Sequence, residues 1–97
     1  GNGEQIAANK VKGVRAALVW STETAVLARE HNDANVISVG GRMHSIEEMT
    51  GFIDTFLTTP FTHDERHVRR IAMMSDFEVS HEFPALPDSA IGLGPDA

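Results

Sequence analysis

The sequence contains no cysteine, and this absence removes several kinds of chemistry at once. Without a thiol the chain forms no disulfide, carries no thiolate nucleophile and offers no cysteine ligand to a metal. A base or nucleophile must therefore be a carboxylate, an imidazole, a hydroxyl or an amine. Long apolar runs are also missing, since none approaches the ~20 residues that span a bilayer, and no export signal opens the chain. We expect a soluble, cytoplasmic protein that does not use a membrane.

Basic residues are scarce, with 8 Lys and Arg against 14 Asp and Glu, which gives a formal net charge of -6. This charge repels the phosphate backbone that supplies most nucleic-acid affinity, so no nucleic-acid partner is expected. Hydrophobic residues make up 41% of the 97 residues and charged residues 23%, as in ordinary globular proteins. We predict that residues 1–83 form part of one domain and that residues 84–97, which are rich in Pro and Gly, form a loose tail.

Apolar spacing and turn residues predict an alternation of helices and strands. Strands are expected at 14–20 and 36–40, and helices at 4–11, 21–32, 45–57 and 62–83. Residues 1–3 are expected to form a glycine turn. Ser21 is expected to cap one helix, and capping boxes are expected from Ser45 with Glu48 and from Thr62 with Glu65.

Helical spacing also predicts which apolar side chains enter the core. They are Ile6, Ala7, Val11, Ala25, Leu27, Ala28, Ile46, Met49, Ile53, Phe56, Leu57, Val68, Ile71 and Ala72, with Met43, Met73 and Met74 as further gap-filling residues.

This order of elements predicts an α/β fold with a parallel sheet flanked by helices. Two apolar parallel strands leave exposed edges, and so narrow a sheet rarely stands without more strands or a partner chain. The opening glycine turn is also typical of a strand-to-helix connection whose strand is absent. We therefore expect the C-terminal portion of a larger α/β unit.

Ligands of open α/β sheets bind beyond the carboxyl ends of the strands, where helix N-termini present free N–H groups. This rule places residues 1–4, 20–24 and 40–44 on one rim. Glu4 could act there as a general base. The alternative is that Glu4 only stabilises the positive end of its helix and that an ordinary turn precedes it.

Three of the eight basic residues fall within positions 66–70. Arg66 and Arg70 are four apart on one helical face, where like charges repel unless an anion lies between them. A phosphate dianion would turn that repulsion into charge-assisted hydrogen bonds. The alternative is a solvated face paired with neighbouring carboxylates, Asp64 among them.

Three histidine positions offer two further candidate chemistries. His31 lies at a predicted helix end, where it could donate or accept a proton or could simply make a capping contact. His63 and His67 are four apart and could bind a metal, but no acidic or cysteine partner at suitable spacing supports this, so no metal is expected.

Several separated motifs resemble one family. They are GNGEQIAANKV (1–11), AREHND (28–33), GGRMH (40–44), FLTTPF (56–61) and ERHVRR (65–70). In order and spacing they resemble the type B ribose-5-phosphate isomerases, relatives of galactose-6-phosphate isomerase, over about residues 1–83.

The resemblance implies a Rossmann-like α/β/α sandwich that dimerises, with active sites shared across the interface and no metal or nucleotide. It implies an aldose-ketose isomerase that interconverts ribose 5-phosphate and ribulose 5-phosphate through an enediolate. Glu4 would move a proton between C2 and C1, and His31 would open the furanose ring. The implied substrate-binding residues are Gly1, Asn2 and Gly3, through backbone N–H groups, and Asn32, Arg42, Arg66, His67 and Arg70.

The chain also departs from the family, because the family's first strand, an Asp-His pair that contacts the sugar, and further strands are not present. We therefore expect this polypeptide alone to be at best weakly active. The alternative function is a non-catalytic phosphate-binding or dimerisation remnant. Conversion of ribose 5-phosphate would separate the two hypotheses.

Overall fold

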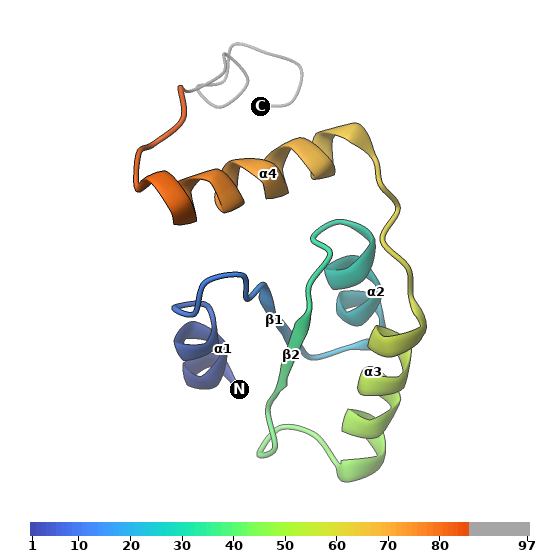
Figure 1. Cartoon of the computed structure of the whole chain (residues 1–97). Coiled ribbons are helices and arrows are strands. Elements are labelled where there is room, and N and C mark those ends of the chain that lie inside the picture. The colour runs from blue at the N-terminus through green and yellow to red at the C-terminus, as the bar shows by residue number, and fades with distance from the viewer. Residues whose placement is uncertain (86–97) are drawn as a thin grey trace.

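The computed structural model describes residues 1–85 (Figure 1). Within that range the chain forms helices and strands in alternation, which confirms the predicted α/β fold. Their bounds are α1 Asn2–Ala8, β1 Ala16–Val19, α2 Thr22–Glu30, β2 Val36–Val39, α3 Ile46–Thr58 and α4 Glu65–Ser80. Most of the tail predicted at 84–97 lies outside the described residues.

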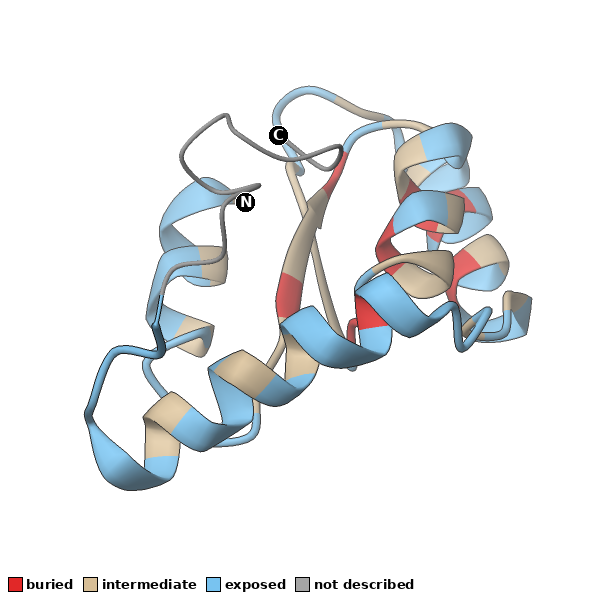
Figure 2. Cartoon of the chain, turned by 90° about the horizontal axis from the view of Figure 1, so that it is seen from above, coloured by how far each residue is buried: buried red, intermediate tan, exposed pale blue. Residues whose placement is uncertain are grey.

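The two strands form a parallel sheet in which Ala16 faces Val36 and Val19 faces Val39. α2 makes the crossover that parallel strands require. α1 lies on one face of the sheet, and α2 and α3 cover the other (Figures 1 and 2). α4 passes across the end at which β2 begins. The helices therefore flank the sheet on both faces, as in a Rossmann-like sandwich.

The hydrophobic core lies between the sheet and the helices α2 and α3 (Figure 2). Its buried residues are Val19, Ala25, Ala28, Ala34, Phe52 and Phe56. The burial of Ala25, Ala28 and Phe56 confirms the predicted helical spacing on these two helices. No helix within residues 1–85 is long and apolar enough to span a bilayer.

Many apolar side chains that were predicted for the core are exposed. They are Ile6, Ala7, Val11, Leu27, Met43, Ile46, Ile53, Leu57, Val68, Ala72 and Met74. The apolar side chains of α1 are exposed because polar side chains of this helix make its contacts with the sheet. On α4 the one buried residue is His67, so the neighbouring face that carries Val68 stays in solvent.

The side-chain amide of Asn9 closes the outer edge of β1. Its Nδ2 donates to the Ala16 carbonyl over 3.0 Å, and its Oδ1 accepts from the Ala16 amide at 2.8 Å. Gln5, one turn earlier, donates to the same carbonyl. β1 needs such partners because an edge strand exposes unpaired N–H and C=O groups. These bonds fix α1, and with it Glu4, relative to the sheet.

Serine side chains begin two helices as predicted. Ser45 Oγ accepts from the Glu48 amide at 3.1 Å, and the Glu48 carboxylate accepts from the Ser45 amide at 2.9 Å. Ser21 caps α2 in the same reciprocal way, with Thr24 as its partner. The two orphan N–H groups that each box satisfies explain why these helix starts are sharply defined.

The capping box predicted for Thr62 and Glu65 is wrong. Asp64 is the N-cap of α4, and no side-chain capping bond forms there. The Thr62 hydroxyl instead donates to the carbonyl of Glu30 over 2.8 Å, which ties the connection to the end of α2. His63 takes a left-handed backbone conformation with a φ of 63°, so helical geometry begins only after it.

Two other helix boundaries differ from the prediction. α1 begins at Asn2, so only Gly1 of the expected glycine turn precedes the helix. α4 ends at Ser80 and not near Phe83, because His81 adopts a left-handed conformation with a φ of 59°.

Candidate functional site

Gly1 lies against the carboxyl end of β2. The Ser38 hydroxyl donates to the Gly1 carbonyl over 2.6 Å. A Cβ at position 1 would lie 2.8 Å from Leu18 Cδ1 and 3.2 Å from the Gly40 nitrogen, so the close approach favours glycine. The structure thus brings together two of the segments predicted for one rim, those at 1–4 and 40–44.

Glu4 lies in the first turn of α1, and its side chain is 78% exposed. Its carboxylate is 3.0 Å from the terminal ammonium of Gly1. The hydrogen bond to that ammonium, then the backbone N–H of Glu4 and the charge of the ammonium, hold the pKa of Glu4 below its usual value. The first-turn N–H groups of Asn2 and Gly3 have no partner within the helix, so this carboxylate lies beside free donors.

Arg42 belongs to the same end of the sheet. It lies in the turn after β2, which the Met43 amide closes by donating to the Gly40 carbonyl over 3.1 Å. The Arg42 side chain is exposed, and no carboxylate of residues 1–85 pairs with it. Its guanidinium is therefore open to an external anion.

His31 and Asn32 lie at the opposite end, directly after α2. The Asp33 carboxylate orders this corner, since it accepts from Arg15 at 3.3 Å and from Arg29 at 3.0 Å. Sequence analysis did not find these two arginines. A basic residue four positions before an acidic one, as in Arg29 and Asp33, was the available signal.

His67 is the buried histidine of this corner, with 6% of its surface exposed. Its ring stacks on that of His31, with centroids 4.4 Å apart and planes 22° from parallel. Desolvation lowers the pKa of His67, and the charges of His31 and Arg66 lower it further, whereas Asp64 opposes them. Within the described part of the chain, Nε2 of His67 has no hydrogen-bond partner.

Arg66 and Arg70 are both exposed on α4. Neither forms an ion pair with a carboxylate in the range 1–85, so the alternative of a face paired with Asp64 and its neighbours is not observed. Their spacing by one helical turn places both guanidiniums on one side of the helix.

The predicted residues thus form two groups within residues 1–85, and neither of the two cavities described below is lined by members of both groups. Glu4 and Arg42 lie where β2 ends, and His31 stacks on His67 of α4, the helix that crosses the end at which β2 begins (Figure 1). Within residues 1–85 neither Arg66 nor Arg70 forms an ion pair with Glu4.

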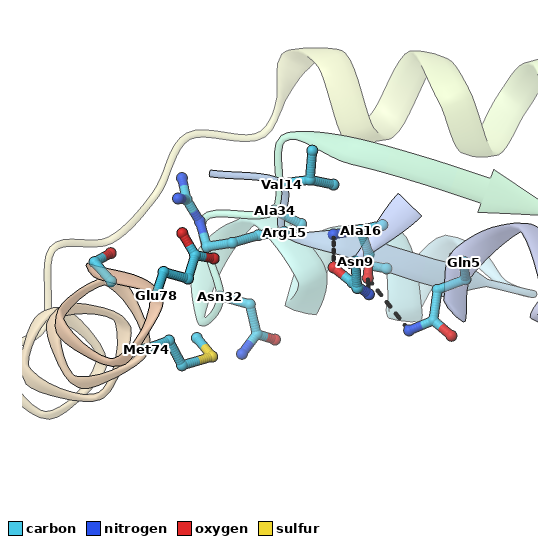
Figure 3. A pocket seen from close by; sticks show the side chains of 11 residues that line it. Gln5, Asn9, Val14, Arg15, Ala16, Asn32, Ala34, Met74 and Glu78 are labelled. Atoms are coloured by element: carbon cyan, nitrogen blue, oxygen red, sulfur yellow. Dashed lines mark hydrogen bonds between the residues drawn. The ribbon is translucent and has the colours of Figure 1, made fainter. Parts of the chain in front are cut away.

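Two hollows of the surface each include one residue of the second group and none of the first. A cavity of about 450 Å³ lies between α1, β1 and α4, and Asn32 is the predicted site residue that lines it (Figure 3). Its polar lining includes Asn9, Arg15 and Glu78. A groove of about 560 Å³ along α4 includes Arg70.

Metal ligation finds no support in the described part of the chain, where no group of three or more His, Asp or Glu side chains could hold an ion. His63 and His67, the weakly suggested pair, make other contacts. The His63 ring lies against Phe61, and the His67 ring lies on His31.

Comparison with known proteins gives these positions a context. The family described as Ribose/Galactose Isomerase matches residues 1–74. Ribose-5-phosphate isomerase B of Mycobacterium tuberculosis H37Rv is 55% identical over 87 residues, which are 90% of this chain and 54% of that protein. The chain therefore spans about half the length of such relatives.

Solved structures agree with the sequence match. The type B ribose 5-phosphate isomerase from Trypanosoma cruzi superposes with a TM-score of 0.80 at 53% identity, over 84% of this chain and 54% of that one. The enzyme from Mycoplasma genitalium, solved with bound ribulose-5-phosphate, gives a TM-score of 0.76 at 45% identity, over 80% of this chain and 51% of that one. The parallel sheet, the flanking helices and the match over residues 1–74 together show that this chain belongs to the ribose/galactose isomerase family.

Proposed function

We propose that this chain is part of an aldose-ketose isomerase that interconverts ribose 5-phosphate and ribulose 5-phosphate through an enediolate. The names of its relatives and the ribulose-5-phosphate bound to the Mycoplasma genitalium enzyme support this reaction. Because the chain spans about half the length of those relatives, the activity is proposed for the assembled enzyme. The chain alone is expected to be at best weakly active.

Glu4 is the proposed base that moves the proton between C2 and C1. Its exposed carboxylate beside the free N–H groups of Asn2 and Gly3 supports this role, because such donors stabilise the negative charge that develops on the enediolate oxygen. His31 is the proposed acid and base for ring opening, since imidazole titrates near neutral pH. Asn32 is proposed to contact the sugar. This scheme uses protein groups alone, without metal or nucleotide.

The phosphate is proposed to bind Arg66 and Arg70, with Arg42 as a further ligand and His67 close by. Unpaired guanidiniums one turn apart support this, because each can donate two hydrogen bonds to a phosphate. A phosphate remote from the reacting carbons orients the sugar without taking part in the proton transfer.

The observation that carries the proposal is the division of these residues into two complementary half-sites. The end of the sheet where β2 finishes offers a carboxylate and free N–H groups, and the opposite end, beside α4, offers an imidazole and guanidiniums. We propose that a homodimer or a higher homo-oligomer brings unlike ends of two copies around one sugar phosphate, in the cytoplasm.

The test is the appearance of ribulose 5-phosphate from ribose 5-phosphate, with the chain alone and with the uncovered part of the Mycobacterium tuberculosis relative supplied as a second polypeptide. We expect supplementation to raise the turnover. Glu4→Gln should abolish it while leaving the fold intact, and Glu47→Gln, an exposed acid on α3, serves as the control. Activity that survives Glu4→Gln removes Glu4 from the role of base.

Mixing two inactive variants tests the shared site. Glu4→Gln and His31→Ala chains, each inactive alone, should together recover about a quarter of the wild-type activity, because half of randomly formed dimers are mixed and each has one intact site of two. No recovery in mixtures that do exchange subunits would place both groups in one copy.

The alternative, a phosphate-binding or dimerisation remnant, is favoured by the separation of the two groups of residues within residues 1–85. It predicts binding of ribose 5-phosphate without turnover under all the conditions above. Arg66→Ala/Arg70→Ala should weaken that binding in either case, whereas unchanged binding would make these arginines a solvated face.

A further inference from the structure

His67 is an unusual residue to find buried on α4. It is the one buried position of that helix, while the apolar Val68 beside it is 44% exposed. Burying an imidazole removes its nitrogens from water, and its Nε2 gains no partner within residues 1–85 in return. A leucine or phenylalanine would fill the same space without that penalty, so burial alone does not account for histidine here.

The contact that His67 does make is with His31. The near-parallel rings, 4.4 Å apart, cover one face of the His31 imidazole. Thr62 holds the two elements in register, since its amide and hydroxyl both donate to the Glu30 carbonyl, at 3.3 and 2.8 Å. α4 is thus fastened to the end of α2 at the point where the two rings meet.

We propose that His67 is a positioning residue for His31, which fixes the orientation of the His31 ring by stacking against one face and leaves the other face and edge for the ligand. The inference rests on the proposed function only for the consequence in catalysis. The coupling between the rings is a property of the fold and is measurable without turnover.

The surroundings of the pair disfavour a proton on His67. Burial lowers its pKa, the charges of His31, Arg66 and Arg70 lower it further, and Asp64 alone raises it. A lowered pKa favours an uncharged ring, which stacks on His31 without charge repulsion.

NMR of the histidine rings tests the stack directly. In the wild type, the ring current of His67 should shift the His31 ring protons upfield. His67→Phe should keep that shift, and His67→Ala should abolish it. His31→Phe should raise the pKa of His67, because it keeps a ring but removes the positive charge. Unshifted His31 protons in the wild type, or an unchanged pKa of His67 in His31→Phe, would overturn the proposal.

Turnover in the supplemented assay then measures the catalytic consequence. His67→Ala should lower kcat by about tenfold or more with a smaller change in KM, since a misplaced group costs rate more than binding. His67→Phe should retain more of kcat than His67→Ala, and Val68→Ala should match the wild type. Equal losses in both His67 variants would mean that the ring nitrogen, and not stacking, is required, which would refute a positioning role.

If no variant or wild type turns over, the proposed isomerase function fails, and the ring-proton shifts and the pKa of His67 still decide whether His67 orients His31.

Discussion

Replacing Asn9 with alanine should release α1 from the sheet. The Asn9 side chain makes two hydrogen bonds with the backbone of Ala16, at 2.8 and 3.0 Å, both partly buried. Each is worth a net ~0.5–1.5 kcal/mol, so their joint loss should lower the free energy of unfolding by about 1–3 kcal/mol. For a chain of this size that is a fall in Tm of roughly 4–24 °C. Asn9→Asp should be at least as harmful, because it keeps the acceptor but sets an oxygen against the Ala16 carbonyl.

Urea unfolding followed by circular dichroism measures the stability, and hydrogen exchange of the Ala16 amide measures the bond itself. That amide should exchange faster in Asn9→Ala, by roughly 5- to 150-fold for the free energies above. Lys10→Ala, at the exposed next position, is the matched control. An Ala16 amide that is equally protected in wild type and variant would refute the argument that Asn9 closes the edge of β1.

Two further predictions concern a helix cap and a titration. Ser45→Ala should cost ~0.5–2 kcal/mol of unfolding free energy, since it removes the N-cap of α3, and an unaltered urea midpoint would show that the box contributes nothing. The pKa of His67 is lower in the folded chain than in the unfolded chain. The unfolded chain therefore binds this proton first as the pH falls below about 6.5. Stability should therefore decline from neutral toward lower pH, and His67→Phe should flatten the decline; equal slopes would refute it.

The order of elements was predictable because each rests on local chemistry. The apolar runs around Val19 and Val39 form strands, and the reciprocal pair of Ser45 and Glu48 begins a helix where expected. The box predicted from Thr62 failed for a tertiary reason, since its hydroxyl bonds Glu30 on another helix. Such competition cannot be read from spacing along the chain.

The core prediction failed where helices lack a covering layer. Helical spacing marks an apolar face on α3, but Ile46 and Leu57 remain 79% and 75% exposed because nothing within residues 1–85 packs on them. On α1 the spacing misled in a different way, since Gln5 and Asn9 bind the sheet through amides while Ile6 faces outward. Periodicity identifies a face and not what the face contacts.

The chemistry of the candidate site remains a prediction, and the distribution of its residues over the fold was not foreseen. The resemblance implied Glu4, His31 and Arg66 as one set. The rule for strand ends placed residues 1–4 and 40–44 on one rim, but it said nothing about where His31 and Arg66 lie. The stacking of His67 on His31 was equally invisible, because it joins two helices that are separated by more than thirty residues.

The polarity of the helices gives a physical reason for two half-sites. A four-residue strand is roughly 13 Å long, and this length separates the groups that lie beyond its two ends. Glu4 lies at a positive helix start, which favours a carboxylate and an enediolate, and His31 lies at a negative helix end, which favours positive charge. One helix end cannot favour both charges. A second copy that presents its helix end to the first copy's helix start supplies both polarities to a single sugar, and this is why the proposed chemistry and the proposed oligomer depend on each other.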